Sequence, residues 1–275
     1  MTLDEPDESD GPDDLEETEQ VTTRAVPEVK MLGTLRVDGV DSDHPLRRGT
    51  ELVAYLTFHR HGVEADTLME ALWPDEAPNS RRLNRTMSRT RVMLGLGPDG
   101  EPLVSYVKEG RYGISPNLHS DIERFADHIR QAARPTGAAE AEHLYAALDL
   151  VEGAPFTTVG IGYNWAHTEG IITHAIVAID NAAHRLAEYA LMHDDPTQAT
   201  WAARKGLVAT RACEECYRNL MRAAVFEGNQ VALEAIYCEL LAVVDADEGP
   251  DASTFLDPET VELYEKVSRK RRQPR

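Results

Sequence analysis

Apolar residues change their spacing along the first half of the chain, and each change predicts a different element. They run almost continuously through 29–39, which predicts a strand. They then recur at helical spacing in 50–60 and 66–73, which predicts two short helices. Thr50 and Asp66 stand at the starts of these helices, where a side-chain oxygen can cap the free backbone N–H groups.

A third helix is predicted over 79–95, with Asn79 or Ser80 as its cap and Gly95 at its end. Its narrow apolar stripe consists of Leu83, Met87, Thr90 and Leu94. Two apolar runs around a polar tip in 103–114 predict a β-hairpin. A strand, three helices and a hairpin in this order indicate a winged helix-turn-helix. In that fold the third helix can enter a major groove and the hairpin forms the wing.

The third helix is basic, although the chain is acidic. The chain has 48 Asp and Glu against 28 Lys and Arg, a formal net charge of −20, yet no acid falls between 77 and 98. Arginines there can meet phosphate oxygens or the O6/N7 edge of guanine. A solvated basic face that pairs with acids elsewhere is the alternative, because arginine is a good helix former. The predicted DNA-contacting residues are Arg81, Arg82, Arg85, Arg89 and Arg91 on the helix, and Lys108 and Arg111 on the wing.

The second half of the chain is helical throughout. Helices are predicted over 121–134, 137–151, 163–193, 196–209, 213–226, 229–246 and 258–270. A repeat relates Leu186, Ala190, Ala199, Ala202 and Leu207 to the residues 34 positions later, Leu220, Ala224, Leu233, Ile236 and Leu241. This is the tetratricopeptide period, and stacked helix pairs of that kind bind partners or one another. The predicted fold is an α+β winged helix-turn-helix domain (29–117) followed by an all-α, tetratricopeptide-like helical repeat domain (121–267).

Charge gathers at the two ends of the chain. Residues 1–20 hold ten acids, no base and almost no apolar residue, so 1–27 is predicted to be a disordered acidic tail. Residues 268–275 are predicted to be a basic tail. The net charge does not exclude DNA binding, because the Debye length is about 8 Å at physiological salt. One hypothesis is that the acidic tail folds back and competes with DNA for the arginines.

The sequence offers no enzymatic signature. GxxxxGK[ST], HExxH and GxSxG are absent, so no activity, cofactor or metal is expected. Cys213 and Cys216 form a CxxC, but zinc takes four ligands and Cys238 is the only other cysteine. The pair is therefore assigned to helix packing. The large aromatics of the helical half are interpreted as core, with a groove for a protein or peptide ligand as the alternative: Tyr163, Trp165 and Trp201.

Several short motifs are similar to one known family. They comprise residues 66–73, 83–84, 88–89, 91, 94–95 and 111–112 in the first half, and 121–125, 150–156 and 220–223 in the second. They resemble the antibiotic-regulatory (SARP-type) activators of actinobacteria, which join an OmpR-like winged helix to a bacterial transcriptional activator domain. The resemblance implies binding to duplex DNA as a homodimer and recruitment of RNA polymerase. Residues 163–166 and 206–207 are similar to a subgroup at the C-terminus of LysM-containing membrane proteins.

A function from a different class is the alternative: a protein-interaction or signalling module, forming the cytosolic end of a larger membrane-associated protein. It is favoured by Thr90 where the family usually has Leu, and by Val92 where it has Arg or Lys. In the wing, Arg111 precedes Tyr112 instead of following it. The chain itself is expected to be cytoplasmic, because no apolar run approaches the roughly 18 to 20 residues of a membrane helix.

Overall fold

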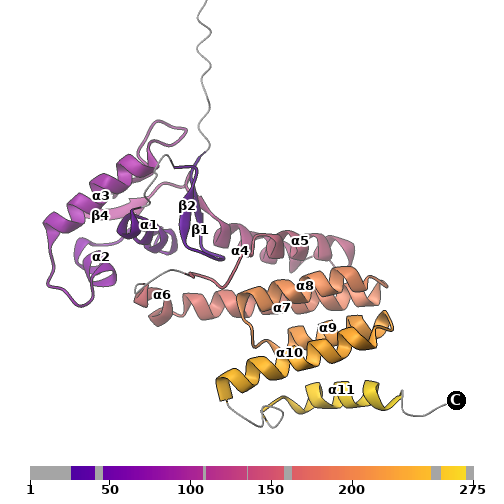
Figure 1. Cartoon of the computed structure of the whole chain (residues 1–275). Coiled ribbons are helices and arrows are strands. Elements are labelled where there is room, and N and C mark those ends of the chain that lie inside the picture. Colours follow the sequence, from indigo (N-terminus) through magenta and orange to yellow (C-terminus); the bar gives the residue numbers. More distant parts are fainter. Residues whose placement is uncertain are drawn as a thin grey trace, which may run out of the picture.

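The computed structural model of the chain has a smaller N-terminal part that contains all its described strands and a larger helical part (Figure 1). Most of the predicted tails, 1–27 and 268–275, and the predicted wing residue Lys108 lie outside the described residues. The structure describes residues 26–40, 46–107, 110–134, 136–157, 163–248 and 255–270.

The N-terminal part contains the three helices and the hairpin of the predicted winged helix. In chain order its elements are β1 (Glu28–Lys30), β2 (Arg36–Asp38), α1 (Arg47–Phe58), α2 (Ala65–Leu72), α3 (Ser80–Leu94), β3 (Val104–Val107), β4 (Arg111–Ile114) and β5 (His119–Ser120). β1 lies between β2, to which it is antiparallel, and β5, to which it is parallel. β3 and β4 form the predicted antiparallel hairpin.

The prediction of a single strand over 29–39 is wrong, because this segment contains two strands, with Val29 opposite Val37. A distant part of the chain holds the turn between them. The carbonyl oxygens of Met31 and Leu32 accept hydrogen bonds from the backbone N–H groups of Phe156 (2.9 Å) and Glu152 (2.8 Å). These bonds satisfy backbone groups that a continuous strand would pair within a sheet.

The two short helices begin before their predicted caps. In α1 the backbone N–H of Thr50 donates to the carbonyl of Leu46 (2.8 Å), so Thr50 is already inside the first turn and buried. α2 begins after Glu64, which places Asp66 inside its first turn. Thr50 and Asp66 are therefore not caps, and neither residue at the cap position makes a side-chain capping bond.

The helical part contains α4 (Asp121–Ala132), α5 (Ala138–Asp149), α6 (Asn164–Thr168), α7 (Ile171–Met192), α8 (Pro196–Ala209), α9 (Glu214–Phe226), α10 (Gln230–Glu248) and α11 (Pro258–Lys270). These match the predicted helices, except that 163–193 is divided into α6 and α7. Gly170 separates them with φ 71°, a left-handed conformation that glycine adopts without strain. None of the described helices is both long and apolar enough to cross a membrane.

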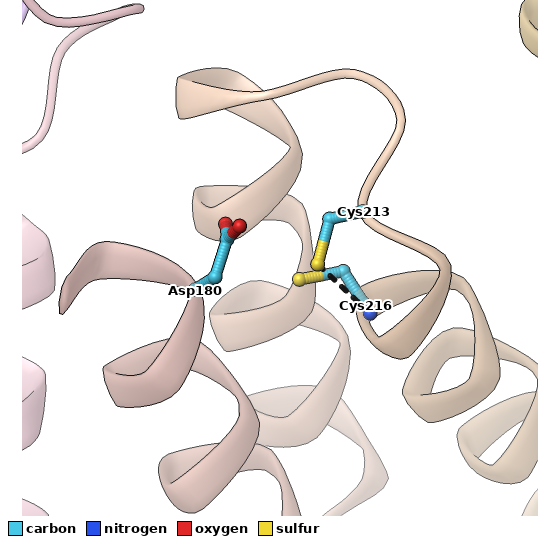
Figure 2. Close-up of side chains that lie close together, drawn as sticks. All are labelled: Asp180, Cys213 and Cys216. Atoms are coloured by element: carbon cyan, nitrogen blue, oxygen red, sulfur yellow. Dashed lines mark hydrogen bonds between the residues drawn. The ribbon is translucent and has the colours of Figure 1, made fainter. Parts of the chain in front are cut away.

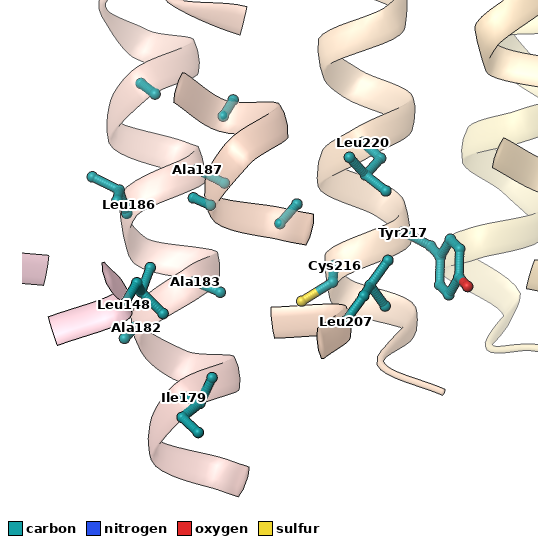
Figure 3. Packing of buried hydrophobic residues seen from close by; sticks show 14 of the residues in the cluster. Leu148, Ile179, Ala182, Ala183, Leu186, Ala187, Leu207, Cys216, Tyr217 and Leu220 are labelled. Atoms are coloured by element: carbon teal, nitrogen blue, oxygen red, sulfur yellow. The ribbon is translucent and has the colours of Figure 1, made fainter. Parts of the chain in front are cut away.

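The predicted 34-residue repeat corresponds to two helix pairs, α7–α8 and α9–α10. Figure 1 shows these pairs stacked between α4–α5 and α11. The repeat positions are buried apart from Leu241, which is partly buried. Figure 3 shows the small residues Ala182, Ala183 and Ala187 of α7 among larger ones such as Leu207 and Leu220. Alanines let neighbouring helices approach closely, so each pair covers the apolar face of the next.

Two clusters of buried apolar residues form the cores of the two parts. The N-terminal cluster takes in residues from far along the chain, among them Phe156, Tyr163 and Trp165. Trp165 meets Tyr55 of α1 edge to face, with ring centroids 5.0 Å apart. Tyr163 and Trp165 are thus core residues, but of the N-terminal cluster, whereas Trp201 is only partly buried in the helical part.

Asp121, the first residue of α4, joins the helical part to β1. Its buried carboxylate accepts hydrogen bonds from the backbone N–H groups of Met31 (2.8 and 3.0 Å) and Leu32 (3.0 Å). Burial raises the pKa of Asp121, and the bonds from Leu32 and Met31 oppose that rise. Nearby, Arg60 pairs with Glu123 of α4 (2.7 Å), and Arg124 of α4 pairs with Glu28 of β1 (2.8 Å), so three side chains of α4 contact the N-terminal part.

Candidate nucleic-acid interface

The sequence of α3 explains both its ends and its buried face. The Oδ1 atom of Asn79 accepts a hydrogen bond from the backbone N–H of Arg82 (3.1 Å), which confirms Asn79 as the cap. Gly95, with φ 75°, ends the helix. All four residues of the predicted stripe are buried: Leu83, Met87, Thr90 and Leu94. The opposite face of α3 is therefore directed to solvent.

Three of the predicted arginines form an exposed row on that face. Arg81, Arg85 and Arg89 are exposed and make no side-chain hydrogen bond or ion pair with any residue that the structure describes. They follow one another at intervals of four, so the row extends about 12 Å along the helix axis, close to the width of a DNA major groove. The row is therefore long enough to span such a groove.

The charge at the start of α3 is locally unfavourable. The first turn of α3 holds no acid and contains Arg81 and Arg82. A helix N-terminus carries partial positive charge, and cations there typically cost about 0.3–1 kcal/mol each. The same N-terminus attracts anions. An external anion bound at this N-terminus would therefore reduce the repulsion between its partial positive charge and the arginines.

Two other predicted arginines are engaged inside the protein. Arg82 forms an ion pair with Glu76, and its guanidinium lies over the ring of Trp73, 5.5 Å from the centroid. The Nε of Arg91 donates to the carbonyl of Val104 in β3 (2.9 Å). Arg91 thereby attaches the hairpin to α3. Neither contact could be predicted from local spacing, because each depends on the tertiary placement of another segment.

The hairpin is also attached to the helices through β4. Arg111, the predicted wing residue that the structure describes, is partly buried at the start of this strand. Tyr112 is buried, exchanges two backbone hydrogen bonds with Val63 (both 2.8 Å), and donates its hydroxyl to Asn84 of α3 (3.2 Å). Arg111 therefore lies on a hairpin that is held against α3 by these contacts.

Thr90 and Val92, the two α3 residues that differ from the usual residues of SARP-type activators, lie in different surroundings. Thr90 is fully buried, and its hydroxyl donates to the carbonyl of Thr86 (2.8 Å), so its polar group is satisfied within α3. A Cβ placed on Gly49 of α1 would lie 2.8 Å from this hydroxyl, so the backbone of α1 packs closely against Thr90. Val92 is 81% exposed, so the solvent face of α3 carries an apolar group as well as basic ones, and Leu96, just past the end of the helix, is 65% exposed.

Outside this interface, the described residues contain one cluster that could hold a metal ion: Asp180, Cys213 and Cys216. The two cysteines were expected to pack between helices, and Cys216 is buried. Asp180 was not foreseen, because no spacing rule links it to the cysteines.

A winged helix joined to a helical repeat part is the architecture that the described residues define. A scan against protein-family models found no match, and a search of the curated proteins found none either. Among solved structures, the chain is similar to Mycobacterium tuberculosis EmbR in complex with a low affinity phosphopeptide, with a TM-score of 0.61 and 20% sequence identity. The match covers 91% of this chain and 66% of the EmbR chain, so this chain spans less than two thirds of that chain's length. At this identity the likeness shows a shared fold.

Proposed function

We propose that the chain is a DNA-binding transcriptional regulator in which α3 enters the major groove and the β3–β4 hairpin flanks it. The observation that carries the proposal is the exposed row of Arg81, Arg85 and Arg89, which has no acidic partner among the described residues. The shared fold with EmbR and the resemblance of the motifs to SARP-type activators support the same function.

The arginine row suits DNA for a physical reason. Guanidinium groups bind phosphates and the guanine edge with two parallel hydrogen bonds, and each neutralised phosphate releases counterions. Arg82 and Arg91 would contribute less, because Glu76 and the carbonyl of Val104 already engage them. The net charge of −20 repels DNA mostly through groups that lie far from α3, and salt screens this repulsion.

The helical part would serve self-association or partner binding. Its stacked helix pairs have the form of repeat proteins that present extended surfaces to partners. By resemblance, we propose that the chain binds DNA as a homodimer in the cytoplasm and contacts RNA polymerase. No enzymatic role is proposed.

The proposal can be tested by fluorescence anisotropy with labelled genomic duplex fragments at about 50 and 200 mM salt. If the three exposed arginines each neutralise one phosphate, the slope of log K against log salt is about −2.7, and affinity falls roughly 40-fold over this range. An Arg85→Ala/Arg89→Ala variant keeps one such contact and should lose only about 3- to 4-fold over the same range.

A matched control removes the same charge elsewhere. Arg134 and Arg211 are also exposed, but they lie outside the N-terminal part. An Arg134→Ala/Arg211→Ala variant should keep the wild-type slope. Equal slopes in all three proteins, or no binding at the lower salt concentration, would contradict DNA contact by α3.

A protein-interaction module is the second candidate. The exposed Val92 favours it, because an apolar side chain beside arginines on one helix face is typical of a protein interface. Under this alternative, the Arg85→Ala/Arg89→Ala variant would lose a protein partner in a pulldown while DNA binding is absent from the wild type.

A further inference from the structure

Three side chains that can bind a metal ion meet inside the helical part. Asp180 comes from α7, Cys213 is the N-cap of α9, and Cys216 lies in the first turn of α9. Their ligand atoms all lie within 4.8 Å of one another. Figure 2 shows the two sulfurs side by side, on the side of α9 that faces Asp180. The cluster therefore links helices from the two repeated pairs, α7–α8 and α9–α10.

The carboxylate of Asp180 is poorly satisfied by the protein. Its Oδ1 atom is buried and has no hydrogen-bond partner among the described residues. Burial raises the pKa of Asp180 to about 6, and a hydrogen bond with Cys213 only partly opposes this rise. A buried carboxylate oxygen without a donor is costly, and a bound cation is one of the few groups that can compensate it.

The two thiols are unequal in the absence of a metal. A hydrogen bond with Cys216 lowers the pKa of Cys213, whose sulfur also accepts the backbone N–H of Cys216 (3.4 Å). The pKa of Cys216 is raised, first by its hydrogen bond with Cys213 and then by burial. Cys213 therefore gives up its proton more readily than Cys216, and a cation that binds both sulfurs has to displace the proton of each.

Gly206 of α8 leaves the space that the cluster occupies. A methyl group at this position would overlap the sulfur of Cys216 and lie 3.8 Å from Oδ1 of Asp180. Any other residue would therefore push the sulfur of Cys216 away. The close approach of α8 at this glycine is what allows ligands from α7 and α9 to share one small space.

We propose that Asp180, Cys213 and Cys216 form a zinc site that joins α7 to α9. Two thiolates and a carboxylate suit Zn²⁺ better than Ca²⁺ or Mg²⁺, which prefer oxygen ligands. Tetrahedral coordination at Zn–S of about 2.3 Å and Zn–O of about 2.1 Å places the ligand atoms roughly 3.5–3.8 Å apart. The cluster would have to contract by about 1 Å at most. Three protein ligands leave the fourth position to water, which can enter because Asp180 and Cys213 are only partly buried.

The test uses the full chain, stripped of metal and kept reduced with a phosphine. Zn²⁺ is titrated against a chromophoric chelator, with wild type, Asp180→Asn, Cys213→Ser and Cys238→Ser compared. Asp180→Asn is nearly isosteric, and Cys238 is an exposed cysteine outside the cluster, so Cys238→Ser is the matched control. Circular dichroism confirms that each variant is folded.

Wild type and Cys238→Ser should bind one Zn²⁺ per chain and release about two protons at neutral pH, one from each thiol. Asp180→Asn and Cys213→Ser should bind at least roughly 10- to 100-fold more weakly, the loss known even for residues that only orient ligands. Unchanged affinity in these two variants, or no binding by the wild type, overturns the proposal. A wild type that binds no zinc but forms a Cys213–Cys216 disulfide under mild oxidation would instead identify a dithiol redox site.

Discussion

Replacement of Asp121 by alanine should destabilise the protein by weakening the attachment of α4 to β1 and the turn that follows it. The Asp121 carboxylate is 1% exposed and accepts the backbone N–H groups of Met31 and Leu32. Alanine offers no acceptor, and both N–H groups would remain buried without a partner. Each such group costs about 1–3 kcal/mol. The loss is offset in part, because the variant no longer buries a carboxylate, whose pKa burial raises.

The expected net loss is about 2–4 kcal/mol in the free energy of unfolding, a large share of the roughly 5–15 kcal/mol typical of a domain. Asp121→Asn should lie between wild type and Asp121→Ala. Its amide oxygen can still accept one N–H, but its NH2 group cannot accept the other. Urea unfolding followed by circular dichroism and tryptophan fluorescence measures these differences.

Asp127→Ala is the control on the same helix. Asp127 is exposed and pairs with Arg130 at the surface, so its loss should change stability by no more than about 0.5 kcal/mol. If Asp121→Ala were as mild as this control, with unchanged dependence on urea, the two hydrogen bonds would not hold α4 to β1 and the reasoning would be refuted.

Two further predictions concern the packing of α3 and the ionisation of Asp180. Thr90→Leu should destabilise the protein by about 1–3 kcal/mol in urea unfolding, because Thr90 is fully buried and packs closely against Gly49, so that a larger side chain overpacks the contact; a gain in stability would contradict this packing. In metal-free protein, burial raises the pKa of Asp180 from 3.8 to about 6, so its charged form is penalised in the folded state. The contribution of Asp180 to the free energy of unfolding is therefore fully present below about pH 4 and is lost as pH rises through about 6. The expected loss is about 1–2 kcal/mol after allowance for solvent screening. Asp180→Asn should not lose stability in this way. If wild type and Asp180→Asn differ in free energy of unfolding by the same amount at about pH 4 and at about pH 7.5, the predicted effect of Asp180 ionisation is excluded.

The elements that the sequence predicted well are those determined by local interactions. The cap at Asn79, the buried stripe of α3 and the ends of α8 depend on neighbouring residues only, and all lie where they were predicted. The DNA-contact assignment stays a prediction. Its arginines could be named from the sequence, but the engagement of Arg82 and Arg91 by other parts of the chain could not.

The errors arise where distant segments meet. The apolar run 29–39 has the composition of one strand, but hydrogen bonds to distant residues, among them Glu152 and Phe156, hold the turn that divides it. Asp180 approaches Cys213 because α7 and α9 both pack on α8, a relation that no local pattern contains. Sequence periodicity identifies which residues are buried, but it does not identify their partners across the fold.

The contribution of Phe156, Tyr163 and Trp165 to the N-terminal core limits how the protein can be dissected. A fragment ending near residue 117, where the hairpin is complete, would lack these three side chains and would expose the face of α1 on which they pack. Such a fragment would tend to aggregate or melt. The shortest autonomous piece that contains the winged helix should instead extend past α6, and so include α4 and α5. Any exchange of DNA-binding modules between related proteins would have to respect the same boundary.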